Sequence, residues 1–203
     1  MNMKNLVLVL CMTGLVTACG LGRTSEPALF YAITTPSVQQ ILGPEKSINV
    51  VIENVSVPQS VDRPQIVVKE TGSNIVNVSE FDRWVEGLGT ALPVAISENM
   101  NMYAKNINAR PGRNAAATRN AKYIVAIDFV RFETEIDGEI KLSAWWTVSN
   151  NRGDVLAQKK TNLHAETPEN KSGTPDYDAI VAEQSRLIAQ LSYKIADVIS
   201  GLK

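Results

Sequence analysis

The C-terminal part of the chain carries the longest helical pattern of apolar positions. Between residues 177 and 201, apolar side chains recur every three or four residues, which places them on one face of a helix. Thr174 and Pro175 precede this stretch and are typical of a helix start, because proline fits the first helical turn. At 1.5 Å per residue the helix is about 40 Å long. The pattern therefore predicts one long amphipathic helix that covers a side of a sheet.

Alternation with a period of two predicts the strands of that sheet. Residues 123–132 are apolar on both alternate sets, which is typical of a central strand covered on both faces. Asp128 interrupts one set, so its carboxylate must be paired, hydrogen-bonded or close to an edge, and we expect an arginine to pair with it. Asp137 and Gly138 are a strong hairpin signal and lead into a return strand over residues 140–148. Further strands are predicted at residues 29–33, 48–57, 61–68, 75–78 and 155–165, the third and fourth as a hairpin and the last as a sheet edge.

A second helical region is predicted in the middle of the chain. Ser79 and Asp82 resemble a capping box, and an apolar helical stripe follows over residues 85–103. Pro93 interrupts this stripe, since proline removes a helical hydrogen bond. We therefore expect either a kink near Pro93 or two consecutive helices, the second capped at Thr90.

Together these patterns indicate a mixed α/β fold in which helices flank a mainly antiparallel sheet. We assign residues 29–203 to a single globular domain. Its length of about 175 residues is ordinary for one domain and sufficient to bury a core.

The N-terminal residues indicate a lipoprotein. An apolar run over residues 6–16 follows Lys4 and is too short to span a bilayer, as in a cleaved secretory signal. Residues 15–19, Leu-Val-Thr-Ala-Cys, resemble the lipobox of bacterial lipoproteins. We expect residues 1–18 to be the cleaved signal peptide and Cys19 to carry a diacylglycerol group and an N-acyl chain. The alternative is an ordinary secreted protein with a chance cysteine near its cleavage site.

The residues after the cysteine suggest where the protein is anchored. Residues 19–28 contain glycine and proline without a hydrophobic period, which predicts an acylated cysteine followed by a flexible tether. Gly20 is not the aspartate that retains such lipoproteins in the inner membrane, so the resemblance implies the outer membrane, facing the periplasm. Of 20 basic and 21 acidic residues, Lys4 leaves with the signal, which gives a net charge of about −2. This charge argues against nucleic acid, or lipid bound by a polybasic patch, as the main partner.

The remaining side chains offer little for catalysis or metal binding. Cys11 leaves with the signal and Cys19 is acylated, so the domain has no thiol for a disulfide or a metal. His164 is its only histidine, and we expect it to be exposed. We predict no enzyme activity, no metal and no cofactor beyond the acyl chains. A hydrolase using Asp62, Asp128 or Glu133 is the weaker alternative, because its carboxylates would have to converge in one cleft.

Several stretches resemble one known family. Residues 62–67, 83–88, 123–146 and 182–199 are similar to the ABC-type transport auxiliary lipoproteins typified by paraquat-inducible protein C (PqiC). The resemblance implies an outer-membrane docking subunit, in the form of a ring-shaped homo-oligomer, that meets a periplasm-spanning MCE-domain protein and its inner-membrane partner. Such systems move lipids between membranes and maintain the envelope. The alternative is a stand-alone lipid-binding or structural lipoprotein, and lipid carriage would need a sizeable apolar cavity.

Five residues are candidates for contacts with a partner. Pro64 holds Arg63 extended, so the opposite charges of Asp62 and Arg63 project to different sides; alternatively, salt bridges of these two residues fix the start of a strand. Trp145 is a large aromatic residue on the polar face of its strand, where it suits an interface anchor. Arg110 and Arg113 lie in residues 105–122, a stretch with no acidic residue. We expect this stretch to form a loop that is either simply solvated or contacts an acidic partner or phospholipid headgroups.

Overall fold

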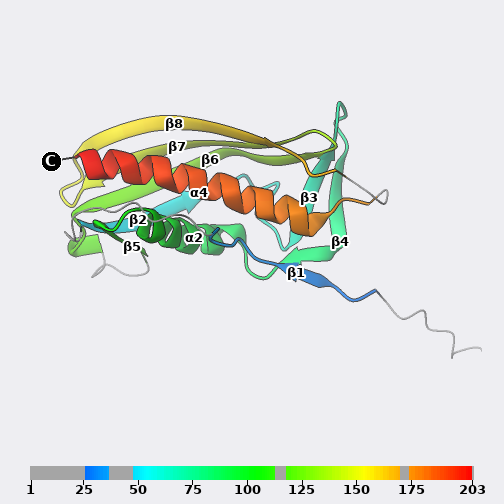
Figure 1. Cartoon of the computed structure of the whole chain (residues 1–203), viewed down its shortest axis with the longest axis horizontal. Coiled ribbons are helices and arrows are strands. Elements are labelled where there is room, and N and C mark those ends of the chain that lie inside the picture. The colour runs from blue at the N-terminus through cyan, green and yellow to red at the C-terminus, as the bar shows by residue number, and fades with distance from the viewer. Residues whose placement is uncertain (1–25, 37–47, 113–117, 170–173, 203) are drawn as a thin grey trace, which may run out of the picture.

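The computed structural model describes residues 26–36, 48–112, 118–169 and 174–202 (Figure 1). These residues form one mixed α/β domain with an eight-stranded sheet and two main helices, so the predicted fold class is confirmed. The elements in chain order are β1 (Leu29–Tyr31), β2 (Ile48–Ser56), β3 (Gln65–Glu70), β4 (Val76–Trp84), α2 (Leu88–Tyr103), β5 (Ile107–Pro111), β6 (Tyr123–Ile136), β7 (Glu139–Asn150), β8 (Val155–Glu166) and α4 (Tyr177–Gly201).

The longest strand, β6, organises the sheet. It pairs antiparallel with β7 along most of its length, and β7 pairs antiparallel with the edge strand β8. On its other edge, the first half of β6 runs parallel to β2, which in turn pairs with β5. The predicted hairpin between β6 and β7 is confirmed, and Asp137 there adopts a positive φ of 53°. Asparagine and aspartate tolerate this conformation better than most residues.

Strands β1, β3 and β4 form one end of the molecule, which we call the tether end because the N-terminal part of the chain enters there (Figure 1). The predicted hairpin of β3 and β4 is confirmed as an antiparallel pair. β3 joins β6 only through Lys69 and Glu70, which lie opposite Glu135 and Ile136. The C-terminal end of α4 lies at the opposite end of the molecule (Figure 1).

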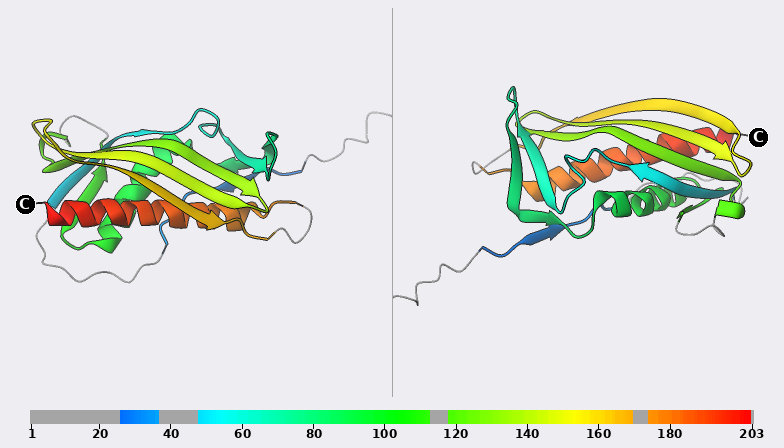
Figure 2. Two further views of the ribbon diagram at one scale, coloured as in Figure 1. Left: turned by 90° about the horizontal axis from the view of Figure 1, so that it is seen from above. Right: turned by 180° about the vertical axis from the view of Figure 1, so that it is seen from behind.

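Both helices cover the same face of the sheet (Figures 1 and 2). The prediction that β6 is covered on both faces is therefore wrong. Val125, Ile127 and Phe129 are buried beneath the helices, whereas Asp128 and Val130 are exposed. On the other face, Ile124 packs in a small cluster with Val51 and Ala121. A register shift after Phe129 turns Phe132 into the core, so the alternation of the sequence does not continue along the whole strand.

The prediction of a helix start at Ser79 is also wrong. The local hydrogen bonds do form: the Asp82 N–H donates to Ser79 Oγ over 2.9 Å, and the Ser79 hydroxyl donates to Asp82 Oδ2 over 2.7 Å. They lie in an irregularity of β4, where the register with β3 shifts. The helix begins at Leu88 and continues past Pro93 as a single element, so the alternative of two consecutive helices is wrong.

Residues 105–122 contain a strand that the sequence did not predict. In β5, Ile107 and Ala109 are buried and alternate with exposed polar residues. The side chain of Asn101, on α2, accepts from the Ala109 N–H over 2.6 Å and donates to the Ala109 carbonyl over 2.8 Å. Asn101 thus satisfies the backbone groups of Ala109 on the edge of β5 that does not pair with β2, as a neighbouring strand would.

Replacing Asn101 tests this contact. We expect Asn101→Ala to lower the free energy of unfolding by about 1–3 kcal/mol, because it leaves two buried backbone groups without partners. Asn108→Ala is the matched control, since Asn108 lies in the same strand and its side chain donates to Asn49 Oδ1, a side chain rather than a backbone group. Urea denaturation measures both variants, and equal losses would contradict a special role for Asn101.

Candidate functional site

Two candidate residues, Asp128 and Trp145, lie opposite each other on the face of the sheet that turns away from α2 and α4, which we call the outer face. On β7, Ala144, Trp146 and Val148 point into the core, so Trp145 and Thr147 point outward. Trp145 keeps 46% of its surface exposed, which agrees with its predicted place on the polar face. The Lys160 ammonium of β8 lies 5.8 Å from the centre of the Trp145 indole ring.

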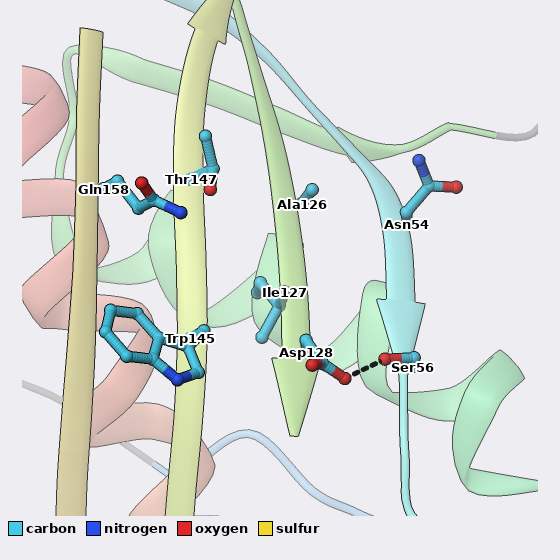
Figure 3. A pocket seen from close by; sticks show the side chains of 8 residues that line it. All are labelled: Asn54, Ser56, Ala126, Ile127, Asp128, Trp145, Thr147 and Gln158. Atoms are coloured by element: carbon cyan, nitrogen blue, oxygen red, sulfur yellow. Dashed lines mark hydrogen bonds between the residues drawn. The ribbon is translucent and has the colours of Figure 1, made fainter. Parts of the chain in front are cut away.

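A hollow of about 590 Å³ lies beside Trp145 on the outer face (Figure 3). Four neighbouring strands, β2, β6, β7 and β8, contribute to it. Its lining mixes polar and apolar groups and consists of Asn54, Ser56, Ala126, Ile127, Asp128, Trp145, Thr147 and Gln158. An aromatic ring beside amide, hydroxyl and carboxylate groups suits a protein side chain or a polar segment better than an acyl chain.

Asp128 is the charged group of this hollow. Its carboxylate accepts a hydrogen bond from the Ser56 hydroxyl (Figure 3), and the two residues are paired in the register of β2 and β6. The predicted arginine partner is therefore wrong within the described residues. Parallel pairing brings Ser56 to Asp128 from 72 positions away in the chain, and no local pattern indicates that contact.

Arg110 lies on the same face as Trp145. Arg110 on β5 lies opposite Val51 on β2, Val51 lies opposite Ile124 on β6, and Ile124 lies opposite Ser149 on β7. Ser149 follows Trp145 by four residues on β7, so both side chains are on the same face of that strand. Side chains in such a row share a face, so Arg110 and Trp145 belong to one surface but lie at separate positions on it. Arg113 lies outside the described residues, as does Cys19.

Asp62 and Arg63 lie away from Trp145, in the segment between β2 and β3. Both are exposed. Asp62 Oδ1 lies 3.9 Å from the positions that a Cβ atom would take at Gly87 and at Gly89, at the start of α2. A negative charge is favourable there, because the helix N-terminus carries partial positive charge. Among the described residues, no salt bridge involves either residue, so the structure does not support the salt-bridge alternative.

The tether end attaches β1 firmly to the domain. The Tyr31 hydroxyl donates to Asp82 Oδ1 over 2.9 Å, and the Val85 N–H donates to the Tyr31 carbonyl over 2.9 Å. The Tyr31 ring also lies 6.5 Å, centre to centre, from the ring of Tyr177 at the start of α4. One short strand therefore links the chain entry to both the sheet and the long helix.

The three carboxylates considered for hydrolysis do not converge. Asp62 lies at the start of α2, and Asp128 lines the hollow beside Trp145. Glu133 pairs with Arg131 over 3.6 Å and lines a different hollow, of about 300 Å³. Within the described residues, no group of three or more His, Cys, Asp or Glu side chains could hold a metal ion.

Some side chains have a pKa that is raised by their surroundings, but these also provide no pair of an acid and a base for catalysis. Burial is the main cause for Tyr31, Tyr103, Tyr177 and Tyr193. The hydrogen bond to Glu135 raises the pKa of Lys141, which also forms an ion pair with Glu139.

His164 is exposed on β8, as predicted. No helix in the part of the chain that the structure describes is long and apolar enough to cross a membrane.

Comparison with known proteins gives a family match and a shared fold. Residues 31–196 match the model of a family described as the ABC-type transport auxiliary lipoprotein component. The chain is similar to the crystal structure of an uncharacterised protein, with 16% sequence identity, a TM-score of 0.67 and coverage of 86% of this chain and 99% of that one. It is also similar to a protein from Xanthomonas campestris, with 17% identity, a TM-score of 0.64 and coverage of 83% and 93%. No curated protein matches the chain.

Because of the hydrogen bond between Tyr31 and Asp82, the free energy of unfolding should vary with pH in the alkaline range. Burial and the bond to Asp82 raise the pKa of Tyr31 to about 12, from 10.0 in the absence of these effects. Between pH 10 and 12 the unfolded chain loses this proton while the folded chain keeps it, so the contribution of Tyr31 to stability falls across that window.

We therefore expect Tyr31→Phe to lower the free energy of unfolding by about 1 kcal/mol at pH 8. The gap between the variant and the unaltered protein should narrow as the pH rises from 10 to 12. Urea denaturation at a series of pH values measures the gap, and the other tyrosines affect both proteins alike. A gap of constant size across this window would contradict the assignment.

Proposed function

This chain belongs to the family of ABC-type transport auxiliary lipoproteins, and we propose that it is the outer-membrane docking subunit of an MCE-protein system that transports lipids between membranes and maintains the envelope. The predicted resemblance to PqiC-like lipoproteins is confirmed over most of the chain. The match over residues 31–196 is the observation that carries the proposal. The partners are a periplasm-spanning MCE-domain protein and its inner-membrane complex.

The anchor in this proposal is Cys19. Two acyl chains already suffice for stable anchoring, and a third strengthens it further. Gly20 directs the protein to the outer membrane, where the domain faces the periplasm, and residues 19–28 form the acylated cysteine and tether. The entry of the chain at one end of the domain supports this arrangement, because the outer face then extends away from the anchor (Figure 1).

The docking surface in this proposal is the outer face, with Trp145 as its centre. Partly exposed tryptophans surrounded by polar groups are frequent anchors of protein interfaces. Arg110 adds positive charge for an acidic partner surface, and Arg113, which lies outside the described residues, stays a predicted contact. Asp62 and Arg63 lie apart from this surface, so we assign them to a second contact with the partner. For the chain itself we propose a ring-shaped homo-oligomer, which head-to-tail contacts generate when the rotation between copies closes.

A non-catalytic role fits both the family and the site. The family is one of transport auxiliaries. In the larger hollow, the carboxylate of Asp128 accepts a hydrogen bond from the Ser56 hydroxyl. The alternative function is a stand-alone lipid-binding or structural envelope lipoprotein. The smaller hollow, lined in part by Val61, Val67 and Val76, is the observation that favours it.

Crosslinking in intact envelopes, followed by purification of the acylated protein, tests the proposal. We expect an MCE-domain protein to be recovered with it. Recovery of copies of this chain and no transporter component would favour the stand-alone alternative and contradict the docking role.

Replacing Trp145 tests the docking surface. We expect Trp145→Ala to reduce recovery of the MCE-domain partner about tenfold or more, because truncation of an interface tryptophan commonly costs 2 kcal/mol or more. Met102→Ala is the control, since Met102 is an exposed apolar residue on α2, on the other side of the sheet. Circular dichroism verifies that both variants are folded. Equal recovery with the two variants would place the docking surface elsewhere.

Two substitutions near the N-terminus test the anchor. We expect Cys19→Ser to release the protein from membranes, because no acyl chain can attach to it. Gly20→Asp should leave the protein acylated but move it to the inner membrane. Fractionation of the envelope measures both effects. Retention of the Cys19→Ser protein in the outer membrane would show that the acyl chains are not the anchor.

A further inference from the structure

Three large apolar side chains are exposed close to the place where the chain enters the domain. Leu29 and Phe30 on β1 have 55% and 63% of their surface exposed, and Val85, directly after β4, has 63% exposed. The parallel register places Phe30 opposite Arg83, two residues before Val85. Consecutive strand residues point to opposite faces, so Phe30 and Val85 share one face of this sheet edge and Leu29 lies on the other. We call the three residues together the tether patch, since exposed apolar side chains gathered at one edge are a candidate interaction site.

The tether patch is preformed rather than loosely attached. The Val85 N–H donates to the Tyr31 carbonyl and the Tyr31 hydroxyl donates to Asp82, so Tyr31 fixes β1 to β4 through both its backbone and its side chain. Leu29 and Phe30 therefore keep a defined position relative to Val85. A preformed surface binds with a smaller loss of conformational freedom than a loose one.

The length of the tether places this patch near lipid. Ten peptide units join Cys19 to Leu29, and even a fully extended chain spans only about 33–36 Å over that length. With Cys19 in the membrane, contact of the patch with lipid is an intramolecular event. Short flexible linkers give effective concentrations in the millimolar range. Even a weak affinity for lipid is therefore enough to keep the patch on the surface.

We propose that the tether patch inserts into the headgroup and acyl boundary of the membrane that holds Cys19. The inference rests on the acyl anchor of the proposed function and adds a second contact, made by the folded domain itself. Glu26 and Glu86 are exposed beside the patch. Arg83 lies opposite Phe30, so charges of both signs flank the patch and its contact with the membrane does not depend on anionic lipid.

This contact would orient the domain. A domain held only by a flexible tether can rotate freely, whereas one held by the tether and by the patch turns its tether end to the membrane. The opposite end, where α4 ends, then faces the periplasm (Figures 1 and 2). The outer face would stand at a fixed angle to the membrane, ready to meet a partner that approaches across the periplasm.

Fluorescence quenching by lipid tests the inference. An acylated Cys19 has no free thiol, so a cysteine introduced at Val85 or Val155 takes up a single nitrobenzoxadiazole label. Val155→Cys is the matched control, because Val155 is the same residue type, is 61% exposed and lies at the start of β8, next to the turn after β7. The acylated proteins are reconstituted in vesicles of phosphatidylethanolamine and phosphatidylcholine that contain a lipid with a quencher on its acyl chain.

We expect the label at position 85 to be quenched at least twofold more than the label at position 155. Added phosphatidylglycerol should not increase the difference, and Phe30→Ser should reduce it while the anchor stays in place. Equal quenching at the two positions would overturn the inference. Shielding of position 85 that increases with protein density but not with quencher would also overturn it, and would assign the patch to a second copy of the chain.

The mass of the N-terminal peptide reports acylation separately. A missing acyl chain would overturn the anchor and with it the proposed function. An acylated protein whose position 85 is not quenched would overturn only the membrane contact of the patch.

Discussion

The packing of both helices on one face of the sheet is the constraint on which the rest of the structure depends. α2 and α4 bury the side of β6 and β7 that carries Ile127, Phe129 and Trp146. Burial of apolar surface provides most of the stabilisation of such a core. Because the two helices share this side, the outer face is left open over several strands, and it can carry Trp145 and Asp128 without any cost to the core.

The same arrangement separates the two ends of the molecule. β6 spans the length of the sheet, with β2 beside its first half and β3 beside its last residues. The tether end is built by β1, β3 and β4, and the buried part of α4 ties that end to the remainder of the domain through Tyr31 and Tyr177. A domain built in this way can hold a membrane anchor at one end and present a separate surface along its length.

The sequence predicts well what depends on local patterns. The hairpin at Asp137, the edge strand β8 and the long helix α4 follow from turn chemistry and from periods of 2 and 3.6 residues. The capping pattern at Ser79 misled because the same side-chain bonds form in an irregular strand as at a helix start. β5 was missed because it is short and is held by Asn101, a contact with another element that no local pattern encodes.

The candidate site could be predicted only in part, for the same reason. Trp145 could be predicted because side chains alternate between the two faces of a strand, so the sequence pattern alone assigns it to the polar face. Ser56 and Gln158 were missed because they reach the hollow through pairing between distant strands. The exposed residues of the tether patch read as ordinary strand residues, since a pattern of apolar residues does not say which of them the core will leave uncovered.

The most direct measurement is photo-crosslinking from position 145 in intact cells. A photoreactive amino acid in place of Trp145 reaches whatever lies against the outer face while the protein is in its own membrane. Docking to the transport system predicts an adduct with a transporter component, identified by mass spectrometry, and no such adduct from position 102 on the helical side. Adducts at position 145 only with copies of this chain, or with no protein at all, would contradict the docking role.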